Sequence, residues 1–301
     1  MPEVLPTRMP LPAHSGGPRR KSAGNPVPRR LENGSGHATF ALDGNNTRVA
    51  SVGSRAPLQL LAPRVAGDVG WLVMGSLGGG LLEGDHIRME LVVRPGAWGY
   101  VTTQASTKVY KSGTGGCARQ NLAAHIGPRA ALILAPDPVV CFAESDYRQE
   151  QNFYLHDQGS LLAVDWFTSG RWLRAERWKF KRYFNRQGFY LNDRPVLIDC
   201  MDLDSSVRRV SSAIGMNRIN ALATVVCLGP LFAHCANALL QRQREIPIQP
   251  GGNIMFGASK LADGFVLRAA GDSAENLGRF LQVELVEAAA AMGTRLWSRK
   301  W

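Results

Sequence analysis

The stretch "HIRMELVVRPGAWGYVTT", residues 86–103, decides the fold class of this chain. Its first eight residues form a short apolar run interrupted by Arg88 and Glu90, which is typical of a strand with one buried face. The "WGYVTT" at its end has the composition of a second strand, and the "RPG" between them contains residues that favour a turn. The stretch therefore predicts two strands joined by a short connection.

The same pattern recurs on both sides of this stretch, from His37 to about residue 205. Further short apolar runs are separated by turn signals such as "LDGN" and "HDQG"; they include "HATFAL", "WLVMGS", "RQNLAAHI", "AALILA" and "LLAVDWF". This recurrence predicts an all-β architecture of many strands. After residue 205 the pattern changes, because residues 230–243 begin with proline and residues 272–292 begin with Asp272 and Glu275 in capping-box spacing. We therefore expect a mainly β chain with a few helices near its C-terminus.

Composition indicates a globular protein. The chain has 301 residues, 45% of them hydrophobic, which suffices for a sizeable core. No apolar run approaches the roughly 20 residues that cross a bilayer, and the N-terminus lacks the apolar region of a secretory signal. The five cysteines are scattered, without a C-x-x-C pair, so we expect reduced thiols. These features predict a cytoplasmic protein with no membrane association.

The formal charge of +11 is concentrated in part at the N-terminus. Residues 1–35 contain six Lys and Arg, two acidic residues and seven of the 17 prolines. Such a composition favours disorder, so we expect a disordered basic arm over residues 1–36 and a single domain over residues 37–301. A transit peptide is the alternative, although its prolines oppose the amphipathic helix that such a signal needs.

The glycine cluster "GSLGGGLLEGD", residues 75–85, does not have the spacing of a phosphate loop. No Gly-Lys-Ser/Thr follows it, and the next residues have a strand pattern where a helix would be needed. Glu83 and Asp85 at its end would point to the same side of an extended backbone. They are either a handle for a cation or part of a solvated turn.

The stretch "RWLRAERWKFKRYFNR", residues 171–186, interleaves aromatic and basic residues. This composition is typical of a surface that binds single-stranded nucleic acid. It also fits an amphipathic strand, in which Arg177, Lys179 and Lys181 share a solvated face while Glu176 and Trp178 share the apolar one. We expect the strand.

Two carboxylates are predicted on apolar strand faces, Glu176 in this stretch and Asp165 in "LLAVDWF". A lone buried carboxylate costs several kcal/mol unless it is paired, protonated or hydrated. Arg171 and Arg174 are the nearby cations that could neutralise either one. A structural ion pair and a functional acid therefore remain alternatives.

Polar residues also gather where a strand is expected, in "VTTQASTKVYK", residues 101–111. They are Thr102, Thr103, Gln104, Ser106 and Thr107. Such a polar strand is unusual in a dry core and has no evident purpose on a surface. Elsewhere the histidines have no metal-ligand spacing and no serine lies in a G-x-S-x-G elbow, so neither a metal cage nor a hydrolytic triad is indicated.

Several of these segments together resemble the UreD (UreH) family of urease accessory proteins. The segments "GSLGGGLLEGD", "VTTQASTKVYKS", "LAPDPVVCF" and "VDWFTSGR", with Glu176 after them, follow the order and approximate spacing of that family. The resemblance extends from about His37 to about Asp202. It implies a β-rich fold of stacked sheets in a helical, β-helix-like arrangement with a few helices.

The resemblance also implies a function. Proteins of this family are non-enzymatic scaffolds that bind a UreF-type protein, which recruits a UreG-type GTPase carrying nickel, and the assembly docks on apo-urease. Ni²⁺ is then a transient cargo, and no cofactor is tightly bound. Asp85 and Glu176 become candidate nickel contacts of an internal water-filled passage. The candidates for its lining are Thr102, Thr103, Gln104, Ser106, Thr107 and Asp165.

The chemistry of these residues fits transit better than storage. Several His or Cys ligands would release Ni²⁺ slowly, whereas isolated oxygen donors hold it weakly enough for transfer. Two alternatives of other classes remain. One is an enzyme that uses Asp85, Asp165 or Glu176 as acid or base, and the other is a basic, β-rich protein that binds nucleic acid.

Overall fold

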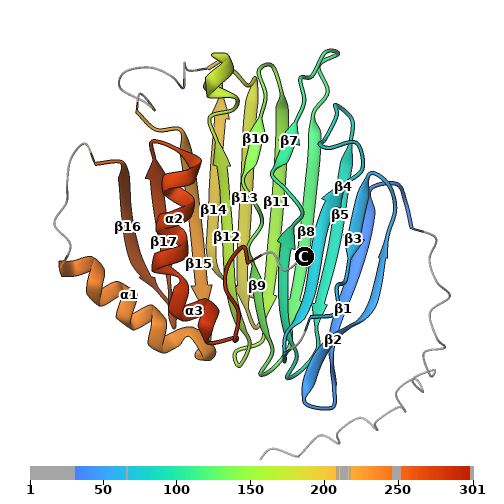
Figure 1. The fold of residues 1–301 in the computed structure, drawn as a ribbon, viewed down its shortest axis with the longest axis vertical. Coiled ribbons are helices and arrows are strands. Elements are labelled where there is room, and N and C mark those ends of the chain that lie inside the picture. Colours follow the sequence, from blue (N-terminus) through green and yellow to red (C-terminus); the bar gives the residue numbers. More distant parts are fainter. Residues whose placement is uncertain are drawn as a thin grey trace, which may run out of the picture. The chain divides into compact units, whose positions relative to one another are not determined.

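The computed structural model describes residues 31–298, apart from residue 66 and residues 208–209, 211–215, 217 and 246–251. Their strands form two sheets, shown in Figure 1. Sheet A has seven strands in the order β14-β13-β11-β8-β5-β1-β2. They are β1 (Ser35–Asp43), β2 (Asn46–Ser54), β5 (His86–Val93), β8 (Ala118–Ile126), β11 (Asp146–Leu155), β13 (Arg182–Leu191) and β14 (Arg194–Asp204).

Sheet B has ten strands, eight of them in the order β16-β17-β15-β12-β9-β6-β4-β3. These eight are β3 (Leu58–Leu61), β4 (Gly70–Ser76), β6 (Trp98–Thr103), β9 (Ala131–Leu134), β12 (Ser160–Thr168), β15 (Ala221–Leu228), β16 (Ile254–Leu261) and β17 (Gly264–Gly271). Two short strands, β7 (Thr107–Val109) and β10 (Val139–Cys141), attach to the end of β12 through β10.

The chain winds between the two sheets as a helix of strands. Successive passes add β5, β8, β11 and β13 in parallel to sheet A, and β6, β9 and β12 in parallel to sheet B. The result is a β-solenoid of about four turns. The mainly β fold with a helical arrangement of stacked sheets and a few C-terminal helices is therefore confirmed.

The central strands of sheet B are buried on both faces, which explains their continuous apolar runs. All nine residues of β12 are buried. Alternate residues such as Leu161 and Phe167 belong to the core between the sheets, whereas Leu162 and Trp166 belong to a second core. That second core includes residues of α1 (Ala233–Glu245), α2 (Ala274–Glu284) and α3 (Val286–Ala290). In Figure 1, α2 lies over β15 and β17, whereas α1 lies at the lower left beside β16 and β17.

The helices begin later than the sequence indicated. Pro230 opens a short 3₁₀ helix, η2 (Pro230–Phe232), and α1 follows from Ala233. At α2 the N-cap is Ser273, whose side chain accepts the N–H of Asn276, so the cap lies one residue after Asp272. The predicted run from residue 272 to 292 divides at Leu285 into α2 and α3.

The prediction of a strand over residues 171–186 was wrong for the residues before Arg182. Residues 172–174 form a 3₁₀ helix, η1 (Trp172–Arg174), a loop follows, and β13 starts at Arg182. Ala175 and Trp178 have φ values of 56° and 55°, in the left-handed region, which an extended strand cannot contain. Trp178 and Phe180 are nevertheless buried, and Lys179 is exposed.

Of the arm predicted over residues 1–36, residues 1–30 lie outside the part of the chain that the structure describes. Its last two residues, Ser35 and Gly36, belong to β1. Contacts divide the chain at the same place, with residues 31–301 as one unit. Within the part of the chain that the structure describes, no helix is long and apolar enough to span a bilayer.

Candidate functional site: a metal path

Most of the predicted site residues lie at one end of the solenoid, here called the η1 end, at the top of Figure 1. In each turn a strand of sheet B finishes where the next strand of sheet A begins. Asp85 immediately precedes β5, Thr103 ends β6, and Glu176 follows η1. Asp165 lies three residues before the end of β12, about 10 Å deeper at 3.3 Å per residue.

The carboxylates of Asp85 and Glu83 do not form a pair. Gly84 between them has a φ of +87°, so the backbone is not extended there. Asp85 is half-buried, and its carboxylate accepts the N–H of Leu82 at 2.8 Å. Glu83 instead accepts the backbone N–H groups of Gly113, Thr114 and Gly116. Of the two, Asp85 is the carboxylate with room for a further ligand.

Hydrogen bonds lower the pKa of Glu83, mainly those from Thr114 and to a smaller extent those from Gly116 and Gly113. The backbone N–H and the hydroxyl of Thr114 make the largest contributions, and the pKa of the carboxyl falls to about 2. Three backbone donors surround one side chain in this arrangement. Glu83 therefore holds the loop of residues 112–116 in place rather than offering a cation site.

The polar run 102–107 is not a uniform lining. The buried Thr102 donates its hydroxyl to the carbonyl of Ala135 at 2.8 Å. Thr103, also buried, donates to the Asp137 carboxylate at 3.0 Å and accepts the N–H of Asp137 at 2.7 Å. Both threonines thus tie β6 to the segment after β9. The others are more accessible, Gln104 being exposed and Ser106 and Thr107 half-buried.

Glu176 is engaged in an ion pair with Arg171. The Nε of Arg171 donates to Oε2 of Glu176 at 2.8 Å and its Nη2 donates to Oε1. Hydrogen bonding from Arg171 is also the main cause that lowers the pKa of Glu176. The Arg171 guanidinium lies 3.9 Å from the centre of the Phe142 ring. The structural ion pair, one of the two alternatives for this residue, is therefore present.

Asp165 has a different environment, because its partners are neutral amides. Gln149 of β11 donates to its Oδ1 at 2.5 Å, and Asn185 of β13 donates to its Oδ2 at 2.7 Å. The side chain points from sheet B into the space between the sheets, and it is buried. Burial raises the pKa of Asp165 to about 6, although the two amides oppose that rise.

Asp165 belongs to a polar layer inside an otherwise apolar core. We define the polar layer by its buried members Asp165, Gln149, Gln151, Asn185 and Gln187. Aromatic residues lie on both sides of it: Tyr147 and Tyr183 at one end and the stacked Phe153 and Phe189, with ring centres 4.9 Å apart, at the other.

The sequence contains a signal for this layer that our sequence analysis missed. The inward residues of β11, Tyr147-Gln149-Gln151-Phe153-Leu155, match those of β13, Tyr183-Asn185-Gln187-Phe189-Leu191. The two strands pair in this register, position for position. Comparison of the two segments would have shown a repeated polar pair between aromatic residues.

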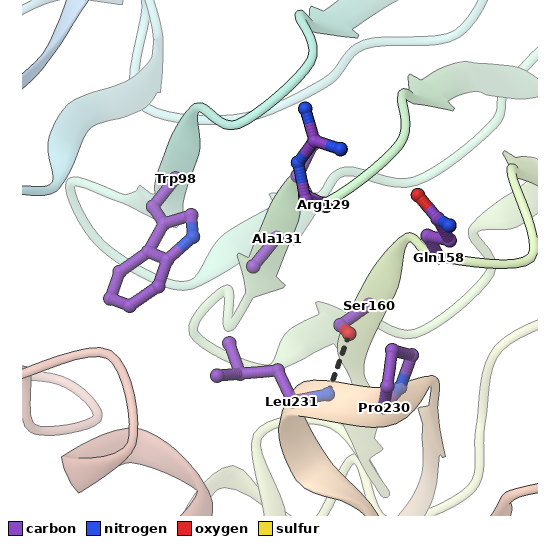
Figure 2. Close-up of a pocket in the computed structure, with 8 residues that line it drawn as sticks. Trp98, Arg129, Ala131, Gln158, Ser160, Pro230 and Leu231 are labelled. Atoms are coloured by element: carbon purple, nitrogen blue, oxygen red, sulfur yellow. Dashed lines mark hydrogen bonds between the residues drawn. The ribbon is translucent and has the colours of Figure 1, made fainter.

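Two hollows lie away from these residues. One, of about 410 Å³, is at the opposite end of sheet B, where Trp98, Arg129, Gln158 and Leu231 contribute to its wall (Figure 2). The other, of about 570 Å³, is lined in part by Arg48, Arg64 and Trp71. None of the predicted site residues lines either hollow. Within the described ranges, no three His, Cys, Asp or Glu residues are grouped to hold a metal.

The fold and the site together define a class of protein, a two-sheet β-solenoid with a buried polar layer. Its sequence matches the pattern of the family described as UreD urease accessory protein over residues 32–301. The chain belongs to this family, whose members are non-catalytic scaffolds that act in urease maturation. The family resemblance is thereby confirmed, and the enzyme and nucleic-acid alternatives lose their support.

Individual relatives agree with the family match. The urease accessory protein UreD of Sorangium cellulosum is 39% identical over 269 residues, which cover 89% of this chain and 84% of that protein. The protein of the same name from Anaeromyxobacter sp. is 39% identical over 278 residues, covering 92% and 93%. Urease accessory protein D of Arabidopsis thaliana is 30% identical over 280 residues, covering 83% and 95%.

Proposed function

We propose that this chain is the cytoplasmic scaffold through which Ni²⁺ reaches apo-urease. It binds a UreF-type protein, which recruits a UreG-type GTPase that carries the metal. Membership of the UreD family supports this proposal. The glycine cluster of residues 75–85 leads into β5 rather than into a helix, so GTP hydrolysis is assigned to the UreG-type partner.

The observation that carries the proposal is the polar layer between the sheets. Buried amides and a carboxylate are costly in an apolar core, and sheet–sheet packing alone does not require them. The Tyr183 hydroxyl beside the layer is buried and, among the described residues, has no hydrogen-bond partner. We propose that the layer is the inner part of the nickel path, where these oxygen atoms contact the ion in passing.

The donor set suits a cargo that must leave again. One carboxylate, amide carbonyls and a phenol oxygen bind Ni²⁺ weakly compared with imidazole or thiolate groups. With a pKa of about 6, Asp165 is ionised in most molecules at neutral pH and still exchanges a proton readily. It can therefore attract the cation without retaining it.

The residues at the η1 end are proposed as the outer part of the path. Among the described residues, the Asp85 carboxylate accepts one hydrogen bond, and the residue is half-buried, so this carboxylate can take a hydrated cation. Gln104, Ser106 and Thr107 offer accessible oxygen atoms at the same end. Glu176 can contact nickel only when its ion pair with Arg171 opens, which makes it the weaker candidate.

The proposal is tested by reconstitution. Apo-urease, the UreF-type and UreG-type proteins, GTP and Ni²⁺ are combined with or without this chain. Urease activity and urease-bound nickel are then measured. We expect both to depend on this chain. Equal activation and nickel content without it would contradict the proposal.

A further inference from the structure

The loop that carries η1 is unusually well anchored, and we call residues 170–181 the η1 loop. At its base, Trp178 and Phe180 are buried in the core between the sheets. The Arg177 guanidinium donates to the carbonyls of Met216 and Ile219 at 2.7 and 3.0 Å. The base of the loop therefore packs as part of the core and does not extend freely into solvent.

The tip of the loop is braced as well. Backbone hydrogen bonds close the turn from Arg174 N–H to the Arg171 carbonyl at 2.8 Å and from Ala175 N–H to the Trp172 carbonyl at 3.0 Å. The ion pair between Arg171 and Glu176 spans the same turn. Glu176 also accepts the N–H of Ala143 at 3.3 Å, which ties the turn to the neighbouring segment.

This bracing holds two large apolar side chains out in solvent. Trp172 is 54% exposed and Leu173 is 82% exposed. A rigid loop loses little conformational entropy when its side chains are covered, and tryptophan is enriched among the residues that dominate protein interfaces. Exposed apolar groups on a rigid support are what a protein-binding site requires.

The charges around the tip indicate what it binds. Arg174 and Lys179 are both exposed, and neither lies within 4.0 Å of a carboxylate among the described residues. The surface therefore combines an apolar centre with positively charged side chains at its edge that form no close ion pair among the described residues. A complementary partner has an apolar cleft bordered by Asp or Glu.

We propose that the η1 loop is a docking site for an acidic protein of the urease maturation complex, with Trp172 and Leu173 as its apolar contacts. This inference rests on the proposed function for the kind of partner. It gives Glu176 a new role: Glu176 is a positioning residue that, through Arg171, holds the turn in its binding conformation.

Nucleic acid fits this surface less well. Single-strand binding uses several exposed aromatic rings on which successive bases stack. Here Trp178 and Phe180 are buried, which leaves Trp172 as the accessible ring of the η1 loop. Leu173, the more exposed neighbour, offers neither a stacking face nor a hydrogen bond.

The test measures binding of the full chain to each purified partner: the UreF-type protein, the UreG-type protein and apo-urease. The double variant Trp172→Ala/Leu173→Ser should weaken binding to one of them by about 30-fold or more, the scale of one interface hot spot. The matched control is Val283→Ser/Val286→Ser, which removes two exposed apolar side chains from the helices. The control should bind like the wild type.

A charge-reversed variant, Arg174→Glu/Lys179→Glu, should weaken the same contact most at low salt. Binding of all three partners within twofold of wild type by Trp172→Ala/Leu173→Ser would overturn the inference. So would loss of binding to a single-stranded RNA oligonucleotide while protein binding is unchanged. If partners bind through the loop but urease activation does not need this chain, the proposed function fails and the docking site stands.

The role of Glu176 has its own test. Arg171→Ala and Glu176→Ala should weaken partner binding to a similar extent. The double variant should bind only slightly more weakly than either single variant, because each single change already removes the same ion pair. A nickel contact at Glu176 predicts instead that Arg171→Ala leaves both partner binding and nickel transfer intact. That result would overturn the positioning role.

Discussion

Asn185 of sheet A donates a hydrogen bond to Asp165 of sheet B across the interior of the solenoid, at 2.7 Å. Gln149 donates to the other carboxylate oxygen from the same side. Both donors are neutral, so they satisfy the lone pairs of Asp165 without cancelling its charge. Glu176, in contrast, is neutralised by Arg171. Asp165 and Glu176, which the sequence analysis treated as similar buried acids, therefore differ: Asp165 has neutral partners and Glu176 has a cation.

The first prediction concerns stability and pH. The pKa of Asp165 is raised from 3.8 to about 6 on folding, so its contribution to stability is fully present below pH 3.8 and is lost as the pH rises through 6. Two pKa units correspond to about 3 kcal/mol. Asp165→Asn should therefore flatten the fall in stability between pH 4 and 6, measured by denaturant unfolding of the purified complex. An unchanged pH profile would show that Asp165 is not the group responsible.

The second prediction concerns the loop that Glu83 holds. The pKa of Glu83 is lowered to about 2, so its contribution is present above pH 4.5 and is lost as the pH falls toward 2. Glu83→Ala should speed amide hydrogen exchange at Gly113, Thr114 and Gly116. Glu90→Ala, on the exposed face of β5, is the control. Equal protection in the two variants would exclude this role for Glu83.

The third prediction separates a nickel contact from a structural role at Asp85. Among the residues that the structure describes, the carboxylate accepts one backbone N–H, from Leu82, and forms no ion pair, so its removal leaves no cation unpaired. Asp85→Ala should keep partner binding while it slows urease activation, with Glu90→Ala, a carboxylate on the exposed face of β5, as a control. Loss of partner binding in Asp85→Ala would instead indicate a structural role.

The fourth prediction concerns the basic segment before the solenoid. Gly34 donates to the carbonyl of Ala56, and β1 begins at Ser35, so the N-terminal boundary of a truncation must precede these residues. A chain without residues 1–30 should form the maturation complex and activate urease at nearly the rate of the full chain. The comparison is a cell-free activation assay. A large loss of activity would identify the segment as a docking element.

Sequence patterns predicted the strands well because burial imposes a period of two on sheet A and continuous apolar runs on sheet B. They did not predict the polar layer. Gln149 and Asn185 look like solvated strand residues until the register places them opposite Asp165. Only the repeated order of side chains in β11 and β13 carries that information.

The η1 loop shows a second limit. Its alternation of basic and aromatic residues imitates an amphipathic strand. Besides Gly170, its residues with positive φ are Ala175 and Trp178, and neither of these two is a residue type that indicates such a conformation. The sequence shows that the threonines of β6 are unusual for a core strand. Their bonds to Ala135 and Asp137 depend on a crossover between distant segments, which no local pattern reveals.

The central claim, that nickel passes the polar layer, is tested most directly by timing its delivery. A complex with Ni²⁺ preloaded on the UreG-type GTPase is started with GTP, and urease-bound nickel is measured over time. Asp165→Asn is compared with Asp193→Asn, a change in the exposed turn after β13, where asparagine tolerates the φ of 62°. We predict normal assembly and GTP hydrolysis in both, with nickel delivery slowed on the order of tenfold in Asp165→Asn alone. Delivery by Asp165→Asn at the wild-type rate would contradict the account.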